Sequence, residues 1–213
     1  MVQSLNEEQQ RRMKEGTLLP IMEHFYTLQG EGAHTGMASY FIRIGGCDVG
    51  CHWCDVKESW EAGRHPLTEV DELIEEVIKY SKTIVLTGGE PLMWNLEYIT
   101  SRLKEKGCTI HMETSGAYPL NGQIDWICLS PKKTMHPKPE VIAKANELKC
   151  IVYNNNDFEF AEKFAAEVSD SCELYLQPEW SKKEIMMPKI VEYILANPKW
   201  KVSLQTHKYL KIP

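Results

Sequence analysis

Cys47-Asp48-Val49-Gly50-Cys51-His52-Trp53-Cys54 is the stretch that decides the fold and chemistry of this chain, because it holds three of its seven cysteines. Their spacing is Cys-x-x-x-Cys-x-x-Cys, and Gly45 and Gly46 come directly before it. Three thiolates on a short, curved loop can hold three irons of a 4Fe-4S cubane, whose usual protein ligands are four cysteines. The fourth iron is then open to a small molecule that carries an amine and a carboxylate. The stretch therefore predicts an iron-sulfur loop at which a reaction takes place.

Two other interpretations of this loop stay open from the residues alone. The three cysteines could join His52 in a Cys3His structural zinc site, although His52 adjoins a ligand and would have to fold back to reach the same metal. They could also be unrelated core thiols, but the flanking glycines and aspartates are typical of a loop. The remaining cysteines stand singly in apolar runs and are expected to be buried small hydrophobes: Cys108, Cys128, Cys150 and Cys172.

Composition and charge are those of an ordinary globular chain. The 213 residues are 43% hydrophobic and 25% charged, which favours one domain large enough to bury its own core. A net charge of -6 gives no general attraction to nucleic acid or to an anionic membrane. We find neither an apolar run of about 20 residues nor the apolar segment of a signal peptide. A clustered triplet in an odd number of cysteines agrees with a reducing compartment. We therefore expect a cytoplasmic protein with no nucleic-acid or membrane partner.

Strands and helices alternate along the chain. Short apolar runs between turn residues predict strands at 24–28, 39–44, 83–86, 108–112, 124–129, 148–153, 173–176 and 201–204. Helical periodicity predicts helices at 70–78 behind Thr68 as N-cap, at 96–106, at 158–168 behind Asp157, and at 183–195. The connection between the strands at 124–129 and 148–153 shows no obvious helix.

This order of elements predicts a mainly parallel sheet with right-handed crossovers. Counted from residue 39, about seven strands with at least four helices are too few for a complete eight-fold barrel. The expected α/β fold is therefore a partial, incomplete parallel β/α barrel. We expect residues 1–20 to form an N-terminal extension, as a short helix or a loose segment, and residues 21–213 to form the barrel domain.

Polar and glycine residues follow one predicted strand after another. The C-terminal ends of parallel strands gather on one rim, where ligands bind, so these residues are candidates for one site. Gly88 and Gly89 allow the backbone to approach a ligand closely. Glu113 or Ser115 could hold a ribose or an amino group, and Lys132 could face a carboxylate. A solvated turn is the alternative for each segment taken singly. The segments are Thr87-Gly88-Gly89-Glu90-Pro91, Glu113-Thr114-Ser115-Gly116, Ser130-Pro131-Lys132, Gln177-Pro178-Glu179 and Gln205-Thr206-His207-Lys208.

Further polar residues lie earlier in the chain. Gln29 and Glu31 stand in a glycine-rich turn and offer an amide and a carboxylate to a polar partner, or else belong to a solvated hairpin turn. Arg43 stands four residues before Cys47.

The cysteine spacing and the Gly-Gly-Glu-Pro segment at 88–91 resemble the radical SAM superfamily, in which S-adenosylmethionine binds the open iron of a 4Fe-4S cluster. From about residue 22 to residue 213 the chain is similar to one family within it, the 7-carboxy-7-deazaguanine synthases of queuosine biosynthesis. The similar segments are Phe25-Tyr26-Thr27-Leu28-Gln29-Gly30-Glu31-Gly32, Cys51-His52-Trp53-Cys54-Asp55, Thr87-Gly88-Gly89-Glu90-Pro91, Asp125-Trp126-Ile127-Cys128-Leu129-Ser130-Pro131-Lys132, Asn146-Glu147-Leu148-Lys149 and Gln205-Thr206-His207-Lys208-Tyr209-Leu210-Lys211-Ile212-Pro213.

The resemblance implies a lyase that converts 6-carboxy-5,6,7,8-tetrahydropterin into 7-carboxy-7-deazaguanine with loss of ammonia, a precursor for tRNA modification. It implies a cluster on Cys47, Cys51 and Cys54, a homodimer, and flavodoxin or ferredoxin as electron donor. With the rim candidates above, it places S-adenosylmethionine on Trp53, Cys54, Asp55, Gly89, Glu90, Glu113, Ser115, Ser130, Pro131, Lys132, Lys133, Gln177, Pro178, Glu179 and Trp180. With the turn at 29–31, it places the pterin on Leu28, Gln29, Gly30, Glu31, Arg43, Thr87 and the carboxylate of Pro213.

Two positions depart from the family pattern. Val56 stands where many members have a threonine whose hydroxyl binds Mg²⁺ beside the substrate, so the magnesium site is in doubt. Ser115 stands where an asparagine is common. The alternatives to a synthase are a radical SAM activase that makes a glycyl radical on a partner protein, an iron-sulfur electron carrier and a zinc-binding module.

Overall fold

The structure, a computed structural model, describes residues 5–213, so the first four residues of the predicted extension lie outside the described part. Within the described part, nine strands form one sheet. The strands are β1 (Leu18–Leu28), β2 (Ala38–Ile44), β3 (Leu67–Glu69), β4 (Thr83–Gly88), β5 (Thr109–Thr114), β6 (Trp126–Leu129), β7 (Glu147–Val152), β8 (Glu173–Pro178) and β9 (Trp200–Val202). The α-helices are α1 (Glu7–Glu15), α2 (Val70–Val77), α3 (Glu97–Glu105), α4 (Pro139–Lys144), α5 (Asn156–Ala165), α6 (Lys183–Ala196) and α7 (Thr206–Leu210).

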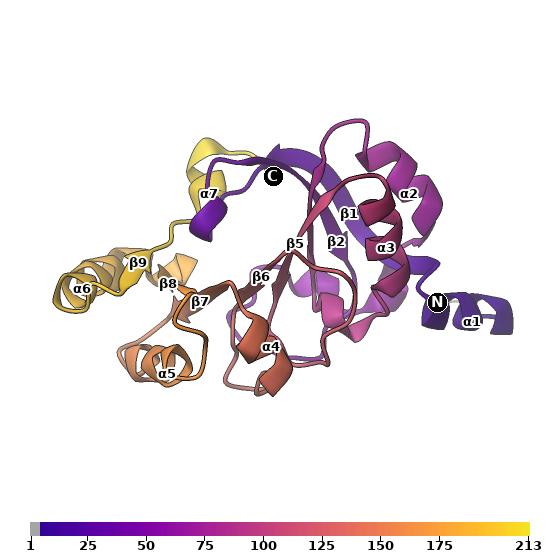
Figure 1. Cartoon of the computed structure of the whole chain (residues 1–213). Helices are drawn as coiled ribbons and strands as arrows, with labels where there is room; N and C mark the ends of the chain where they lie inside the picture. The colour runs from indigo at the N-terminus through magenta and orange to yellow at the C-terminus, as the bar shows by residue number, and fades with distance from the viewer. Residues whose placement is uncertain (1–4) are drawn as a thin grey trace.

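The sheet is a curved, open arc. Its strand order is β3-β1-β2-β4-β5-β6-β7-β8-β9, so that β3 and β9 are its two edges. β1 runs antiparallel to β2 and β3, and all pairs from β2–β4 to β8–β9 are parallel. Helices α2 to α6 cover the outer side of this arc, whereas α7 lies toward its inner side (Figure 1). The predicted partial parallel β/α barrel is confirmed.

The core lies between the sheet and the outer helices. Ile84, Val85 and Leu86 of β4 are fully buried, as expected for a parallel strand covered on both faces. Helix α2 turns its predicted apolar face inward, and Leu73 and Ile74 on this face are 2% exposed. The predicted N-cap of this helix is wrong, because Thr68 lies in β3 and Glu69 takes the N-cap position.

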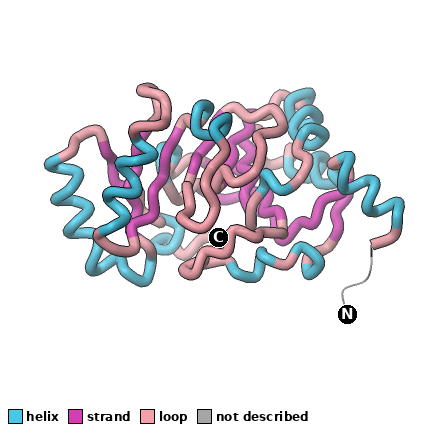
Figure 2. Tube along the Cα trace, turned by 90° about the horizontal axis from the view of Figure 1, so that it is seen from below, coloured by secondary structure: helices cyan, strands magenta, loops and turns pink. Residues whose placement is uncertain are grey.

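The described part of the predicted extension, residues 5–20, packs onto the domain. The Asn6 side chain accepts a hydrogen bond from the Gln9 N–H, and the Gln9 side chain accepts one from the Asn6 N–H, which together cap α1. Arg12 pairs with Glu69. Because β1 begins at Leu18, the end of the predicted extension belongs to the sheet. In a view from below, α1 projects at one side and the C-terminus lies among the central loops (Figure 2).

Short elements account for the remaining differences from the sequence predictions. Helix α4 fills the connection that showed no obvious helix, and it begins at Pro139, a favoured first helical residue. Helix α7 forms where a strand end was expected. Asp157 lies inside the first turn of α5, and its Oδ2 accepts hydrogen bonds from the N–H groups of Tyr153 and Asn154. From residue 5 to residue 213, every helix is too short or too polar to cross a bilayer.

Candidate active site

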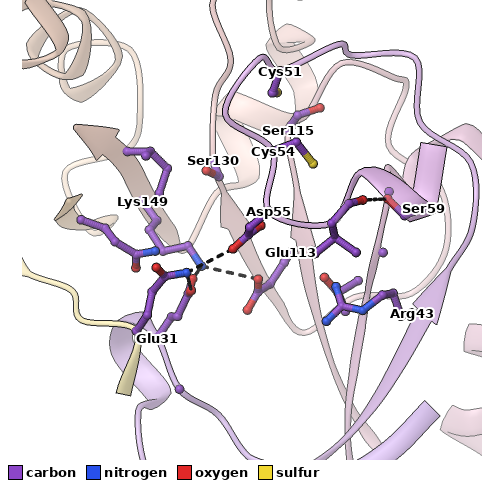
Figure 3. Close-up of a pocket in the computed structure, with 18 of the residues that line it drawn as sticks. Glu31, Arg43, Cys51, Cys54, Asp55, Ser59, Glu113, Ser115, Ser130 and Lys149 are labelled. Atoms are coloured by element: carbon purple, nitrogen blue, oxygen red, sulfur yellow. Dashed lines mark hydrogen bonds and ion pairs between the residues drawn. The ribbon is translucent and has the colours of Figure 1, made fainter. Parts of the chain in front are cut away.

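One cavity of about 460 Å³ opens on the inner side of the sheet, at the C-terminal ends of the parallel strands. In Figure 3, Cys51 and Cys54 lie at one end of this cavity, Glu31 and Lys149 lie at the other, and Arg43 lies on a separate side. All predicted site residues line the cavity except Pro131 and Lys133. Lys133 instead forms an ion pair with Asp157 of α5. Nearly all of the site residues predicted from the sequence therefore lie in one cavity.

The two glycines after β4 hold the cysteine loop in place. The Gly89 N–H donates to the Ile44 carbonyl (3.0 Å) and the Glu90 N–H to the Gly46 carbonyl (2.9 Å). Gly88 has a φ of 145°, and a Cβ on it would lie 2.0 Å from the Ile44 carbonyl oxygen. Only glycine allows the strand end to approach so closely. The backbone that leads into Cys47 is thereby fixed to the end of β4.

The three cysteines of the loop are half-buried free thiols that line the cavity. Burial raises the pKa of Cys47 to about 11 and also raises the pKa of Cys51. A bound metal reverses this tendency, since it deprotonates the thiols that coordinate it. His52, the fourth ligand of the zinc alternative, is exposed, and its ring lies edge-on to Tyr153 with 5.2 Å between the centroids.

The cavity wall beside the loop carries the strand ends predicted to hold S-adenosylmethionine. The Lys132 ammonium lies 5.6 Å from the centre of the Trp53 ring and donates to the carbonyl and the hydroxyl of Ser130, both at 2.6 Å. Burial lowers the pKa of Lys132. Aromatic and cationic groups thus meet at the side of the cavity nearest the cysteines.

The Glu90 carboxylate forms its hydrogen bonds with other residues of the protein. Its carboxylate accepts hydrogen bonds from the Thr114 hydroxyl (2.5 Å), the Leu92 N–H (3.0 Å) and both the N–H (2.8 Å) and the hydroxyl of Ser115. Glu90 is also 1% exposed. The side chain therefore joins the turn after β4 to the end of β5, and Ser115 is engaged in the same contact.

Two of the residues predicted to bind the pterin contact carboxylates. The Gln29 amide donates to Glu113 (2.9 Å), and Arg43 donates through Nε to Glu23 (2.7 Å). Thr87 is the sheet neighbour of Arg43. Glu113, considered from the sequence for S-adenosylmethionine, thus lies with Gln29, on the side predicted for the pterin.

Lys149 is a cavity residue to which the sequence analysis assigned no role. It is 4% exposed, and its Nζ lies 2.6 Å from Glu31 and 3.5 Å from Glu113. Burial disfavours the charged form of Glu31, but the attraction of Lys149 outweighs it and lowers the pKa of Glu31 to about 2. The sequence could have indicated a buried lysine here. Glu147 and Lys149 are two residues apart in a buried strand, so their side chains must face the same side of the sheet.

Hydrogen bonds hold helix α7 and the residue before it against the cavity wall. The Thr206 N–H and hydroxyl both donate to the Gly30 carbonyl at 2.9 Å. Gln205 donates to Glu31 (2.9 Å), and the Lys208 ammonium donates to Asp55 (3.1 Å), directly after Cys54. The segment therefore connects the turn after β1 to the cysteine loop.

The sequence model of the Radical SAM superfamily matches residues 41–152. A 7-carboxy-7-deazaguanine synthase of Flavobacterium psychrophilum is 60% identical over 98% of this chain and 100% of the relative. The chain belongs to the 7-carboxy-7-deazaguanine synthase family. A synthase of the same name from Synechocystis sp. is 50% identical over 91% of the chain and 93% of the relative. The crystal structure of QueE from Escherichia coli is similar to this structure, with a TM-score of 0.82 and 30% sequence identity. The match covers 95% of this chain and 100% of the QueE chain.

Membership in the synthase family decides between the alternatives left open by the sequence. It favours a radical SAM synthase over a radical SAM activase, an electron carrier or a zinc module, and the superfamily implies a 4Fe-4S cluster and S-adenosylmethionine. The residues fit these groups, because three free thiols and a cationic, aromatic wall line one cavity. They fit magnesium poorly: Val56 lines the cavity without a side-chain oxygen, and its carbonyl accepts a hydrogen bond from the Ser59 hydroxyl (2.7 Å).

Proposed function

We propose that this chain converts 6-carboxy-5,6,7,8-tetrahydropterin into 7-carboxy-7-deazaguanine and ammonia. The observation that carries the proposal is one cavity with three free thiols at one end and an amide, two carboxylates and an arginine elsewhere on its wall. The names of the family relatives support the same reaction. Product and ammonia together contain the atoms of the substrate, so the conversion needs no net oxidant.

The cofactor side of the cavity would be held by two groups of residues. Cys47, Cys51 and Cys54 would bind the cluster. S-adenosylmethionine would lie against Trp53 and Lys132, with the backbone at Gly89 and the segment 177–180 completing its site. When bound, the cluster and S-adenosylmethionine supply a radical able to remove a hydrogen atom from the substrate.

On the substrate side, the task of the protein is binding and orientation. The guanidinium of Arg43 can pair with the carboxylate of the pterin, while Gln29 and Thr87 offer donors and acceptors to its ring. Pro213 also lines the cavity and is proposed as a substrate contact. The hydrogen bonds of Thr206 to Gly30 and of Lys208 to Asp55 hold α7 beside the cavity, where it would help to keep water away from a reactive intermediate.

The experiment that tests the proposal uses protein reconstituted anaerobically with iron and sulfide. Incubation with S-adenosylmethionine, a reductant and 6-carboxytetrahydropterin is expected to yield a deazapurine with release of ammonia. A protein that binds zinc at the cysteines and takes up neither iron nor sulfide would contradict the proposal.

We further propose a cytoplasmic homodimer that receives electrons from flavodoxin or ferredoxin, in line with the family resemblance. A pure sample is expected to have twice the chain mass by light scattering. The reduced form of either donor is expected to support turnover without a chemical reductant, and turnover supported by neither donor would contradict this assignment.

We also propose that turnover depends only weakly on magnesium. Val56 supplies no hydroxyl, and the neighbouring Asp55 carboxylate is engaged by Lys208. Mg²⁺ binds through oxygen ligands in near-octahedral geometry, and this part of the cavity offers few that are free of other contacts.

A further inference from the structure

The inner end of the cavity contains a group of charges buried inside the barrel. Lys149 of β7 lies between Glu31, in the turn after β1, and Glu113 of β5. The Lys149 side chain is 5% exposed, whereas the side chains of Glu31 and Glu113 are 14% and 26% exposed. The ammonium is thus shielded, and the two carboxylates lie between it and the cavity.

Each carboxylate is held by two different partners and still has lone pairs free. In Glu31, Oε2 accepts from Lys149 and Oε1 accepts from Gln205. In Glu113, Oε1 accepts from Gln29 and Oε2 faces Lys149. A carboxylate oxygen can accept two hydrogen bonds, so both groups can accept further donors from a ligand in the cavity.

A single ammonium between two carboxylates leaves an excess of negative charge that faces the cavity. The other groups that act on Lys149 are Cys128 of β6, Glu147 of β7 and the ammonium of Lys132. Burial raises the pKa of Glu147, whose Oε2 is fixed by the Ala33 N–H and the indole N–H of Trp126. Other donors thus hold Glu147, whereas the Lys149 ammonium contacts Glu31 at 2.6 Å and Glu113 at 3.5 Å.

We propose that Lys149 is a positioning residue that holds the carboxylates of Glu31 and Glu113 in place facing the cavity, where they accept hydrogen bonds from the donor edge of the pterin. This inference rests on the proposed function. The 2-amino group and the N3–H of a pterin form an edge of donors that two carboxylates complement. Lys149 acts through the two carboxylates and does not itself touch the substrate.

The test measures pterin binding without turnover, so that it does not depend on the radical reaction. In the absence of reductant, 6-carboxytetrahydropterin is titrated into wild type, Lys149→Met and Lys149→Gln, the last of which keeps an amide donor in case the methionine variant does not fold. We expect both variants to bind the pterin about 10- to 100-fold more weakly, as for the loss of a charge-assisted hydrogen bond. Binding of S-adenosylmethionine to the reconstituted variants is expected to stay within about threefold of wild type.

The pH dependence separates positioning from a purely structural role. Once the ammonium is removed, burial of Glu31 is no longer offset by Lys149 and raises the pKa of this carboxyl, so pterin binding by the variants should strengthen as pH rises from about 6 to 9. The wild-type series provides the reference for titration of the pterin and of His207, the histidine that acts on Glu31. Lys201→Met, which removes an exposed ion pair with Glu173, is the matched control and should bind like wild type.

The outcomes distinguish the inference from the function on which it rests. Wild type that neither binds nor converts the pterin contradicts the proposed function. Wild type that binds the pterin, together with Lys149 variants that bind it equally well and with the same pH dependence, overturns the role of Lys149.

Discussion

The cysteines of this chain differ in their surroundings, and this difference predicts which of them hold iron. Cys51 lines the cavity, whereas Cys172 is buried beside the Glu173 carbonyl. Cys51→Ser should lose most of the iron and sulfide taken up on reconstitution, because a hydroxyl does not replace a thiolate ligand. Cys172→Ser is the control, and it should retain the metal content of wild type. Chemical analysis of iron and sulfide measures both, and an equal loss in the two variants would contradict the assignment.

Val56 leads to a prediction about magnesium. Wild-type turnover of the pterin should change by less than about twofold between a chelator and excess Mg²⁺, since Val56 offers no oxygen ligand. Val56→Thr restores a hydroxyl at this position and should make turnover respond to added Mg²⁺. Initial rates at several metal concentrations measure the response. A strong magnesium dependence of the wild type would show that other oxygens hold the ion.

At single positions, site residues could be predicted where a sequence motif allows only a few kinds of ligand. The cysteine spacing and the polar strand ends led to residues that share one cavity. Lys149 was overlooked because a lysine usually lies at the surface, and its two carboxylate partners are 118 and 36 residues away in the chain. Glu90 was assigned to a ligand, although its hydrogen bonds are made inside the protein.

At the scale of elements, the contact between β4 and the cysteine loop predicts a contrast between two glycines. Gly88→Ala places a Cβ against the Ile44 carbonyl and should lower the free energy of unfolding by more than about 2 kcal/mol, with a lower iron content. Gly107 also has a positive φ, but a Cβ there meets no atom within 4 Å. Gly107→Ala should cost about 1 kcal/mol and leave the iron content unchanged. Chemical denaturation and iron analysis give the two readouts, and similar results for both variants would contradict a special role for Gly88.

Helix α7 predicts an effect on substrate binding. Thr206→Val removes the hydroxyl that donates to the Gly30 carbonyl and should raise the KM for the pterin about threefold to tenfold. Steady-state kinetics measure this change. Thr109→Val, at the exposed start of β5, is the control. An unchanged KM in Thr206→Val would indicate that α7 does not influence the substrate side.

Long elements could be predicted because they repeat their pattern several times. Helix α2 shows its apolar face over two turns, and β4 is a continuous apolar run between turn residues. The elements that were missed are short: β3 has 3 residues, α4 has 6 and α7 has 5. Such segments contain too few periods to distinguish them from loops, and packing against the sheet decides their conformation.

At the scale of the whole molecule, two buried groups predict the response to acid. Burial lowers the pKa of His111 to about 4, so this ring is neutral in the folded protein while it binds a proton in the unfolded chain. Stability should therefore fall by roughly 2 kcal/mol as pH decreases from about 6.5 to 4. The lowered pKa of Glu31 adds a second loss between about 4.5 and 2.

His111→Phe tests the first of these losses. A phenylalanine keeps the ring contacts with His34 and Trp126, whose ring centroids lie 4.4 and 6.3 Å from that of His111. The variant should show a flatter dependence of unfolding free energy on pH between about 6.5 and 4. Denaturant titrations across this range provide the measurement. A slope as steep as that of wild type would show that other groups cause the acid sensitivity.

The edges of the open sheet have a consequence for the behaviour of the protein in concentrated solution. A long exposed strand edge serves as a template onto which another chain can add. Here both edge strands, β3 and β9, have only 3 residues. β3 pairs only with Leu18–Pro20 of β1, so within residues 5–213 the rest of β1 has no strand partner on that side. Where another chain adds to this sheet at high concentration, we therefore expect it to add along β1 and not along β3 or β9.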